Sequence, residues 1–349
     1  TADPQPIFGG YAMPEAVPYQ PTLVEPDCNT PVIIVPESYG PPPGPYSHLV
    51  PSAYPYPQTG APMTPPNLQI PTAGQPTSGR APWFPGGGRN RVFQKVELTA
   101  DYLPRFSDDS LGMTDAQFDV VFGLPLITRE TPLLITPFYG IHLLDGPNTP
   151  DVPPRLHDAA VHLEHFRPLN DDWLLMADIT LGEFADDDSF NSSEAFRITG
   201  GGAGVWRPND RWKWVFGATY VNRANTQILP VAGFIYTPHD DAEYRLVFPA
   251  PKISWRLPWS DVPGLDERWF YIAGEFGGGA WAVTRDDGGG HPLNIPDGRI
   301  SLGLGRRIVG GLSRRIELGY VFSRTLEYES DGHSIDLDDT LMLRGGLTY

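Results

Sequence analysis

The sequence predicts an all-β fold: a transmembrane, antiparallel, up-and-down β-barrel of 14 strands, or alternatively 12, preceded by an extended proline-rich N-terminal arm. Three observations predict this fold. Apolar and polar residues alternate with a period of two over most of residues 92–349. Short turns and long loops alternate between these segments. The 40 prolines and 38 glycines among 349 residues disfavour long helices and favour turns.

Residues 1–91 form the predicted arm, which holds 22 of the 40 prolines and six of the 15 tyrosines. Proline fixes φ and lacks a backbone donor, so we expect this region to be extended, largely polyproline II, and not helix or interior sheet. A disordered linker is the alternative. Tyrosines along a stiff extended chain suit docking into grooves, so the arm is expected to bind partners.

The first half of the predicted barrel, which spans residues 92–349, alternates clearly. Leu98, for example, lies between the polar residues Glu97 and Thr99. Pro137 interrupts the third segment, because proline cannot donate to a strand ladder. We expect the first five strands near residues 95–102, 115–124, 133–143, 159–164 and 175–181.

The second half keeps the same period. Four glycines between residues 200 and 204 would let one strand bend sharply. Further strands are expected near residues 196–204, 212–220, 268–284, 300–305, 315–322 and 340–349.

Residues 224–267 decide the strand count. The flanking segments, 211–223 and 268–284, both run outward, so an odd number of strands must lie between them. Three strands, at residues 227–236, 243–248 and 251–257, give 14 in all, which we prefer. One strand gives 12, with residues 222–241 as a large outer loop. Pro249 and Pro251 fit either a tight outer corner or a kink.

The connections alternate in length. Short turns are expected at residues 126–131, 169–172, 208–211 and 309–313. Longer loops rich in Asp, Gly and Pro are expected at residues 107–113, 145–156, 185–193, 285–298 and 329–336. Short turns at one end and long loops at the other are typical of outer-membrane barrels, whereas a Greek-key sandwich has no reason to keep that alternation.

The last segment places Leu341, Leu343 and Leu347 on one face and stops on the aromatic Tyr349. This ending resembles the C-terminal strand of bacterial outer-membrane β-barrels. Together with the strand pattern and the phrases at residues 229–238 and 246–257, it resembles uncharacterised bacterial outer-membrane families related in style to small porins. The resemblance implies a barrel in the outer membrane with its first strand starting on the periplasmic side, and hence a periplasmic arm.

Composition excludes several classes of function. The net charge of −17 disfavours a nucleic-acid partner, since binding phosphates needs basic patches. No run of 18 apolar residues predicts a transmembrane helix. The chain starts without a basic and apolar leader, so it is expected to be mature or never exported. The lone Cys28 excludes an internal disulfide and a cysteine metal cluster, and is a bystander or pairs between molecules.

The polar faces of the predicted strands carry charges that would line the lumen if the apolar faces meet lipid. Eight positive and seven negative side chains nearly balance, so the lumen would not select strongly by sign. It would either pass small solutes or be closed by salt bridges or by the arm. We expect ten of these residues to line the pore: Lys95, Glu97, Asp119, Glu164, Asp178, Arg197, Lys213, Arg315, Glu317 and Arg344.

Acidic and aromatic residues offer weaker candidates. Asp186, Asp187, Asp188, Asn191 and Glu194 could supply oxygen ligands to Ca²⁺ but follow no known calcium-loop spacing, so an acidic solvated surface is preferred. The tryptophans suit an interfacial girdle better than a carbohydrate platform. Seven of them fall mostly near predicted strand ends: Trp206, Trp212, Trp214, Trp255, Trp259, Trp269 and Trp281.

No hydrolase, metalloprotease, phosphate-loop or dinucleotide motif is present, so no catalytic residue, metal or cofactor is expected. His162 and Glu164 share a face and form an expected lumen pair, while His165 lies on the other face; His291 and His333 are rim candidates without a motif.

We therefore expect an outer-membrane barrel for small solutes or for envelope structure, in contact with lipid. Its arm is expected to bind envelope subunits, and a homo-oligomer is possible. The alternative is a secreted soluble β-protein that binds carbohydrate.

Overall fold

The computed structural model describes most of the chain beyond residue 91. The described residues are 92–107, 110–126, 131–147, 151–222, 227–259, 266–285, 290–308, 310–329 and 333–349. The predicted arm and Cys28 lie outside them. Within these ranges no helix is long and apolar enough to cross a membrane.

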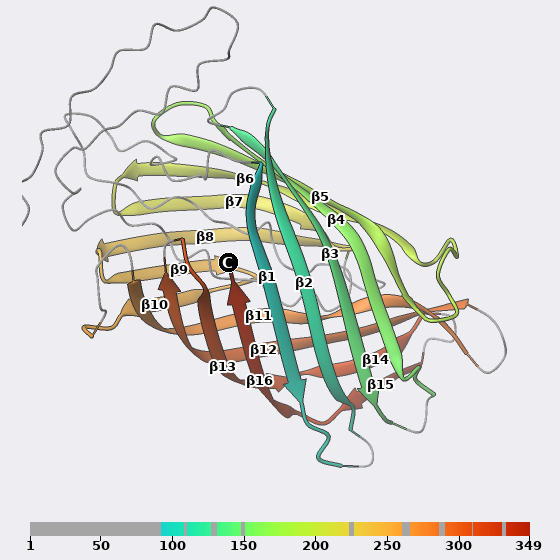
Figure 1. Ribbon diagram of the computed structural model, residues 1–349. Coiled ribbons are helices and arrows are strands. Elements are labelled where there is room, and N and C mark those ends of the chain that lie inside the picture. The colour runs from blue at the N-terminus through green and yellow to red at the C-terminus, as the bar shows by residue number, and fades with distance from the viewer. Residues whose placement is uncertain are drawn as a thin grey trace, which may run out of the picture. The chain divides into compact units, whose positions relative to one another are not determined.

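The described residues form sixteen β-strands in one sheet (Figure 1). The strands are β1 (Phe93–Leu103), β2 (Gly112–Pro125), β3 (Pro132–Asp145), β4 (Arg155–Pro168), β5 (Trp173–Asp186), β6 (Phe196–Asn209), β7 (Trp212–Tyr220), β8 (Ile228–His239), β9 (Ala242–Phe248), β10 (Lys252–Arg256), β11 (Asp266–Thr284), β12 (Gly290–Ile308), β13 (Ser313–Phe322), β14 (Arg324–Tyr328), β15 (His333–Leu337) and β16 (Thr340–Thr348).

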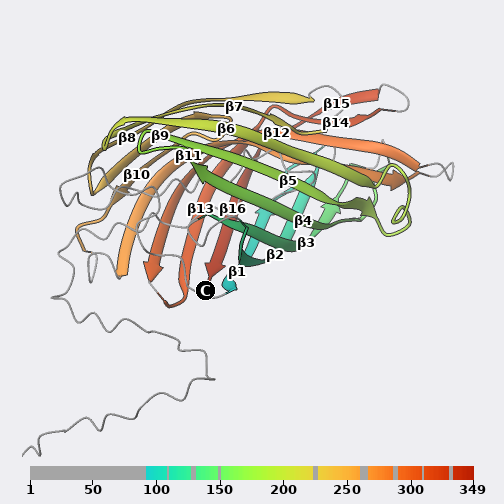
Figure 2. The same cartoon turned by 90° about the horizontal axis from the view of Figure 1, so that it is seen from above.

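Fourteen of these strands close into a ring. Each strand from β1 to β12 pairs with its successor, β13 pairs with β16, and β16 pairs with β1, all antiparallel. Figure 2 shows β13, β16 and β1 side by side at this closure. β14 and β15 are not part of the ring. They pair with each other as a hairpin, and β14 also pairs with β12. The predicted antiparallel barrel of 14 strands is confirmed, and the 12-strand alternative is wrong because β8, β9 and β10 occupy the disputed region.

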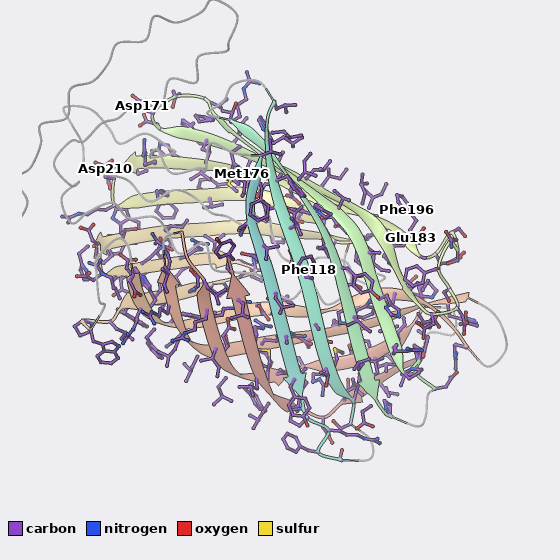
Figure 3. All side chains as sticks on the ribbon, viewed as in Figure 1. Phe118, Asp171, Met176, Glu183, Phe196 and Asp210 are labelled. Carbon is purple, nitrogen blue, oxygen red and sulfur yellow. The ribbon has the colours of Figure 1, made fainter. Side chains whose placement is uncertain are left out.

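The two ends of the barrel differ. We refer to the end where β1 begins and β16 ends as the proximal end, and to the other as the distal end. At the proximal end Val96 and Tyr349 exchange two backbone hydrogen bonds of 3.0 Å, which close the seam between the first and last strands. Tight turns occur there, two of them marked by Asp171 and Asp210 in Figure 3. Most of the longer connections lie at the distal end.

Apolar side chains cover the outside of the ring. On β13, Ile316, Leu318 and Tyr320 are 48–58% exposed, whereas Glu317 between them is 3% exposed. The same alternation exposes Phe118 on β2 and Phe196 on β6, both labelled in Figure 3. An apolar exterior of this extent is foreign to soluble monomers, whereas a closed barrel with an apolar outside is the architecture of outer-membrane proteins. The chain is therefore an outer-membrane barrel in contact with lipid.

An aromatic belt follows the proximal ends of β7 to β11. The ring of Trp212 stacks on Tyr236 at 4.3 Å between centroids, and Tyr236 stacks on Tyr244 at 6.1 Å. Trp255 meets Tyr244 edge-on at 6.2 Å and stacks on Phe270 at 5.9 Å. Such a belt is typical of the membrane interface, as the girdle interpretation expects.

Two tryptophans assigned to the girdle do not belong to it. Trp269 and Trp281 are buried on the inner side of β11, where the indole nitrogen of each donates to a carboxylate. Strand parity explains Trp269, because it alternates with the outward-facing Phe270. Trp281 follows a bend that the alternation does not indicate.

Two segments expected to be loops are strands. β12 begins at Gly290 and pairs with β11 as far as Thr284, so most of residues 285–298 is strand. β14 and β15 form a hairpin that takes up most of the connection before β16. The prolines at 292 and 296 suggested a loop because they cannot donate, yet their positions are still paired with Ala282 and Gly278 across the hairpin.

A charge placed on the lipid-facing surface tests the membrane assignment. Leu318→Arg at the middle of β13 should destabilise the folded barrel by about 2–4 kcal/mol, because the charge of the arginine would face hydrocarbon there. Leu312→Arg, in the exposed proximal turn before β13, should cost about 0–1 kcal/mol. The check is urea unfolding of the barrel in lipid vesicles, followed by the difference in migration between boiled and unboiled samples. Equal costs for the two variants would contradict a membrane-spanning β13.

Candidate functional site: the lumen and its cap

One hairpin of the barrel is much taller than its neighbour. β11 and β12 have 19 residues each, whereas β10 has five. The last pair between β10 and β11 is Lys252 with Ala273. Residues 274–284 of β11 therefore extend beyond β10 toward the distal end.

The extension bends at Gly277 and Gly278. Gly278 has a φ of +74°, and a Cβ atom there would lie 1.6 Å from the carbonyl oxygen of Ile295. A Cβ atom on Gly277 would lie 2.1 Å from Asp297 Oδ1. Only glycine fits such a bend. Beyond it, residues 279–283 are buried on both faces of the strand, so the hairpin no longer exposes a face to lipid.

The hairpin beyond the bend crosses the distal mouth, and we refer to residues 279–285 and 290–295 as the cap. Ala282 pairs in parallel with Ala185 of β5, although β6 to β10 separate β5 from β11 in the ring. The Thr284 backbone nitrogen donates to Asp186 Oδ2 at 2.7 Å, and the Thr284 hydroxyl lies 2.8 Å from that of Ser189. In Figure 1 the hairpin extends to the right, toward the ends of β4 and β5.

A buried histidine ties the cap to the wall. Trp281 Nε1 donates to Asp158 Oδ1 at 2.8 Å. His142 lies between two carboxylates, with Nδ1 2.9 Å from Asp115 Oδ1 and Nε2 3.1 Å from Asp158 Oδ2. Its ring meets the Trp281 ring edge-on at 5.3 Å. The cap is thereby linked to β2, β3 and β4 through one polar cluster.

The β14–β15 hairpin lies beside the cap. Tyr328 of β14 pairs with Leu293 of β12, and its hydroxyl donates to the backbone oxygen of Asp151 between β3 and β4. The Arg285 guanidinium lies 4.4 Å over the Tyr328 ring and donates to Asp151 Oδ1 at 3.1 Å. Both hairpins therefore hold the same distal loop.

An apolar core fills the space beneath the two hairpins. Its buried side chains come from the cap, from β14 and β15, from the inner faces of seven other strands of the ring, and from the residue just before β2. The residues are Leu103, Leu111, Met113, Phe138, Leu156, Ala160, Phe184, Trp281, Val283, Leu293, Ile295, Val321, Leu326, Tyr328, Leu337 and Met342. The distal half of the barrel is packed like the interior of a soluble domain.

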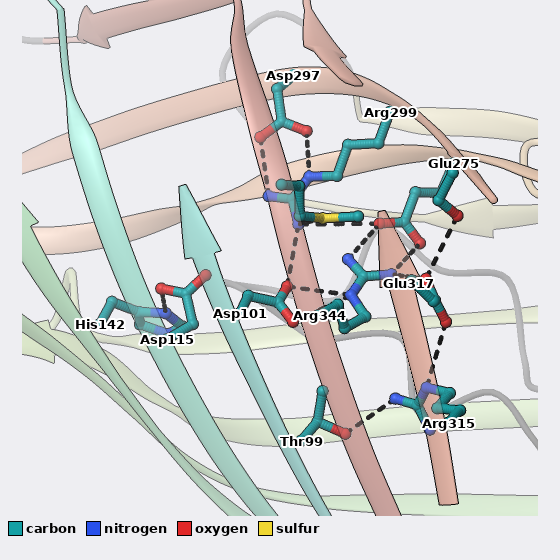
Figure 4. A network of polar contacts seen from close by, with 12 residues as sticks. Thr99, Asp101, Asp115, His142, Glu275, Asp297, Arg299, Arg315, Glu317 and Arg344 are labelled. Atoms are coloured by element: carbon teal, nitrogen blue, oxygen red, sulfur yellow. Dashed lines mark hydrogen bonds and ion pairs between the residues drawn. The ribbon is translucent and has the colours of Figure 1, made fainter. Parts of the chain in front are cut away.

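A layer of buried ion pairs includes Arg344 of β16 (Figure 4). Arg344 Nε lies 3.0 Å from Asp101 Oδ1, its NH2 group 2.7 Å from Glu275 Oε1, and its NH1 group 3.2 Å from Glu317 Oε2. Three carboxylates from three strands thus meet one guanidinium.

Two further arginines extend this layer. Arg299 donates to both carboxylate oxygens of Asp297, at 2.7 and 2.8 Å, and lies 3.5 Å from Asp101. Arg315 Nε lies 3.2 Å from Glu317 Oε1, and its NH2 group donates to Thr99 Oγ1 at 3.0 Å. Asp297 lies opposite Gly277 in the register, and Glu275 precedes the bend by two residues, so the layer holds the base of the cap.

The ten residues predicted to line the lumen lie at inward positions. Eight are buried, and Lys95 and Asp178 are half-buried. The structure brings Arg315, Glu317 and Arg344 into one network. It pairs Lys95 Nζ with Glu97 Oε1 at 2.7 Å. That these side chains line an open route stays a prediction.

The remaining five of the ten lie elsewhere on the wall, outside the network around Arg344. Gln117 donates to Asp119 Oδ1 at 2.8 Å. Arg197 donates to the backbone oxygen of Asn222 at 3.0 Å. Glu164 lies opposite Asp178, and Lys213 lies in a different row on β7. His162, the expected companion of Glu164, hydrogen-bonds the Thr180 hydroxyl instead, at 2.8 Å.

The sequence-based reading did not find the cap. Its anchors are Asp158, just before an expected strand, Asp186, in an expected loop, and Trp281, which was assigned to the girdle. The run of glycines at 277–279 was the available signal, because consecutive glycines in a strand mark a bend or a close approach.

In the acidic distal loop considered for Ca²⁺, between β5 and β6, several carboxylates form hydrogen bonds or ion pairs with other groups of the protein. Asp186 Oδ1 accepts from the backbone nitrogens of Asp188 and Ser189. Asp187 contacts Arg155 at 2.8 Å. The Ser193 hydroxyl donates to Glu194, which lowers the pKa of that carboxyl. Within the described ranges no group of three or more His, Cys, Asp and Glu side chains is arranged to hold a metal ion.

Comparisons with known proteins identify one family and several similar solved structures. The family model described as "Domain of unknown function (DUF6268)" matches residues 146–334. No curated protein sequence matches the chain. Similar solved structures include "KdgM porin", at 7% identity and a TM-score of 0.33 over 73% of this chain and 98% of that one. The β-domain of the Bordetella autotransporter BrkA has 9% identity and a TM-score of 0.33 over 74% and 99% of the two chains.

Replacing Arg344 tests how much the ion-pair layer contributes to the free energy of unfolding. Arg344→Met leaves Asp101, Glu275 and Glu317 buried without their shared cation, and we expect a loss of about 3–5 kcal/mol in the free energy of unfolding. Arg314→Met, on the exposed face of β13, should change it by less than about 0.5 kcal/mol. Urea titration in detergent micelles measures both. If the two variants lost stability equally, the layer would not be structural.

Proposed function

The chain belongs to the DUF6268 family, and we propose that it is an outer-membrane channel for small solutes that the cap closes at its outer mouth. The proximal end faces the periplasm, as the short turns of such barrels do. The observation that carries the proposal is the cap itself, a hairpin that leaves the wall at two glycines and is held across the mouth by non-covalent contacts.

The free energy needed to detach the cap from the barrel argues against a constantly open pore. Opening would expose Trp281, Val283, Leu293 and Ile295, at about 1.5–3 kcal/mol each. The total of roughly 6–12 kcal/mol corresponds to an open fraction between about 10⁻⁴ and 10⁻⁹. Passage therefore needs a trigger that favours the open state by a comparable free energy, such as a ligand bound at the outer face.

A structural role is the second candidate. The apolar core and the ion-pair layer fill much of the barrel, which suits a rigid envelope component that never opens. In that case the function lies with the partners of the N-terminal arm. We expect no enzymatic activity in either case, since no catalytic motif is present.

The arm, residues 1–91, is proposed to lie in the periplasm because it precedes a strand that starts at the proximal end. Its tyrosines and prolines suit grooves on other envelope subunits or on further copies of this chain. Its single thiol, Cys28, is available to report such contacts by cross-linking.

Locking the cap tests the channel proposal. Ala185 and Ala282 are paired neighbours, so Ala185→Cys with Ala282→Cys, in a Cys28→Ser background, should form a disulfide between the cap and β5. Single-channel recording in a planar bilayer should show rare openings in the parent protein, none in the oxidised variant, and recovery on reduction. Replacing residues 279–295 by two glycines should give steady conductance.

Two results separate the candidates. Ala282→Cys alone controls for the substitution and should behave as the parent. Silence of the cap-deleted protein, with insertion confirmed by heat-dependent migration, would rule out the channel and leave the structural role.

A further inference from the structure

Three arginines occupy neighbouring positions on the outer face of the barrel, near its proximal end. They belong to β11, β12 and β13, which are neighbours in the ring (Figure 1). Arg268 of β11 lies directly opposite Arg306 of β12, and Arg306 lies directly opposite Arg314 of β13. Directly opposite Cα atoms of antiparallel strands are about 5 Å apart. We refer to these three residues as the arginine row.

Strand alternation places the arginine row on the side that faces lipid. On β13, Arg314 is exposed, whereas its neighbour Arg315 is buried. Two residues further toward the distal end, Leu304 and Ile316 are 52% and 55% exposed. Leu304 lies opposite Phe270 of the aromatic belt. The arginine row therefore lies one step outside the apolar surface, at the level of the lipid headgroups.

The charge of the arginine row is only partly compensated. Like charges at directly opposite positions repel one another. Asp266, on the same face of β11, accepts from Arg306 Nε at 2.9 Å and from its NH2 group at 2.5 Å. Arg314 forms no ion pair with any residue that the structure describes. Three arginines and one aspartate leave two positive charges in excess, so the surface favours an anionic partner.

The membrane itself supplies an anion of the right chemistry at this level. A guanidinium group binds phosphate through paired, charge-assisted hydrogen bonds. Two columns of apolar side chains lead from the arginine row toward the middle of the membrane, Leu304 with Leu302 and Ile316 with Leu318. All four are 49–58% exposed. A phospholipid fits both features, because its phosphate lies at the interface and its acyl chains lie in the hydrocarbon.

We propose that the arginine row binds the phosphate of an anionic phospholipid, whose acyl chains lie along the two apolar columns. The bound lipid offsets the repulsion within the row and belongs to the leaflet at the proximal end, which is the periplasmic leaflet in the orientation given above. β11 and β12 also form the cap at their other end, so the lipid holds the base of that hairpin in the membrane. Lipid binding does not depend on whether the barrel conducts.

Quenching by brominated lipids measures which lipid occupies this surface. Leu304→Cys in a Cys28→Ser background, labelled with a small fluorophore, places a reporter two residues from Arg306 in the full-length protein in vesicles. We expect brominated phosphatidylglycerol to bind there about five-fold or more tightly than brominated phosphatidylcholine, since each basic residue at an anionic interface contributes about that factor.

Phe216→Cys on β7 is the matched control. Phe216 is 51% exposed, and it lies opposite Gly204 and Ala232, so its neighbours across both ladders carry no charge. The two lipids should quench a label at position 216 equally. An equal preference for the anionic lipid at positions 216 and 304 would reflect the general charge of the barrel and would overturn the proposal.

Substitutions in the arginine row separate lipid binding from an effect on folding. Arg268→Gln with Arg314→Gln should abolish the preference at position 304, while Arg306 stays in place to pair with Asp266. Asp266→Asn should increase the preference several-fold, because it removes the competing carboxylate. A preference that survives the double substitution, or that falls in Asp266→Asn, would contradict a phosphate at this place. Heat-dependent migration confirms that each variant is folded.

Discussion

The structure depends on one constraint: a chain in lipid must pair all its backbone groups within itself. Closure of the ring by β16 between β13 and β1 satisfies it, with the two hydrogen bonds between Val96 and Tyr349 at the seam. Once the ring is closed, the side-chain alternation assigns every second residue to lipid. Burial of those apolar residues adds little to the cohesion of the barrel, because lipid tails are as apolar as they are.

Cohesion must therefore come from the strand ladders and from the interior. The interior is layered, with the apolar core under the cap, the ion-pair layer around Arg344, and a second cluster of buried apolar side chains, which includes Leu174, Val205 and Val215, in the proximal half. The core supplies the hydrophobic term that the exterior cannot. The ion pairs fix geometry more than stability, since desolvation offsets much of their attraction. Their position at Glu275 and Asp297 fixes the place where the hairpin leaves the wall.

Much of the fold was predictable from the sequence because lipid and lumen impose a period of two. That period placed most of the strands, and the parity of directions limited the disputed region to one strand or three, of which the structure has three. Pro137 illustrates a local signal that tertiary pairing overrides: it lies within β3, where the ladder to β2 has a gap between Asp119 and Phe122. The cap was missed although the run of glycines at 277–279 was available as a signal, because a period of two does not tell where a strand leaves the wall. In the structure the φ of Gly278 marks that place.

The short strands β9 and β10 affect the thickness of the surrounding bilayer. These strands have seven and five residues, whereas a transmembrane strand normally needs about 9–11. Hydrocarbon beside them must shorten to match, so the membrane is thinnest along this one side of the barrel. Lipids with short or disordered tails are favoured there. The hydrophobic thickness of the barrel is therefore unequal around its circumference and is smallest at β9 and β10.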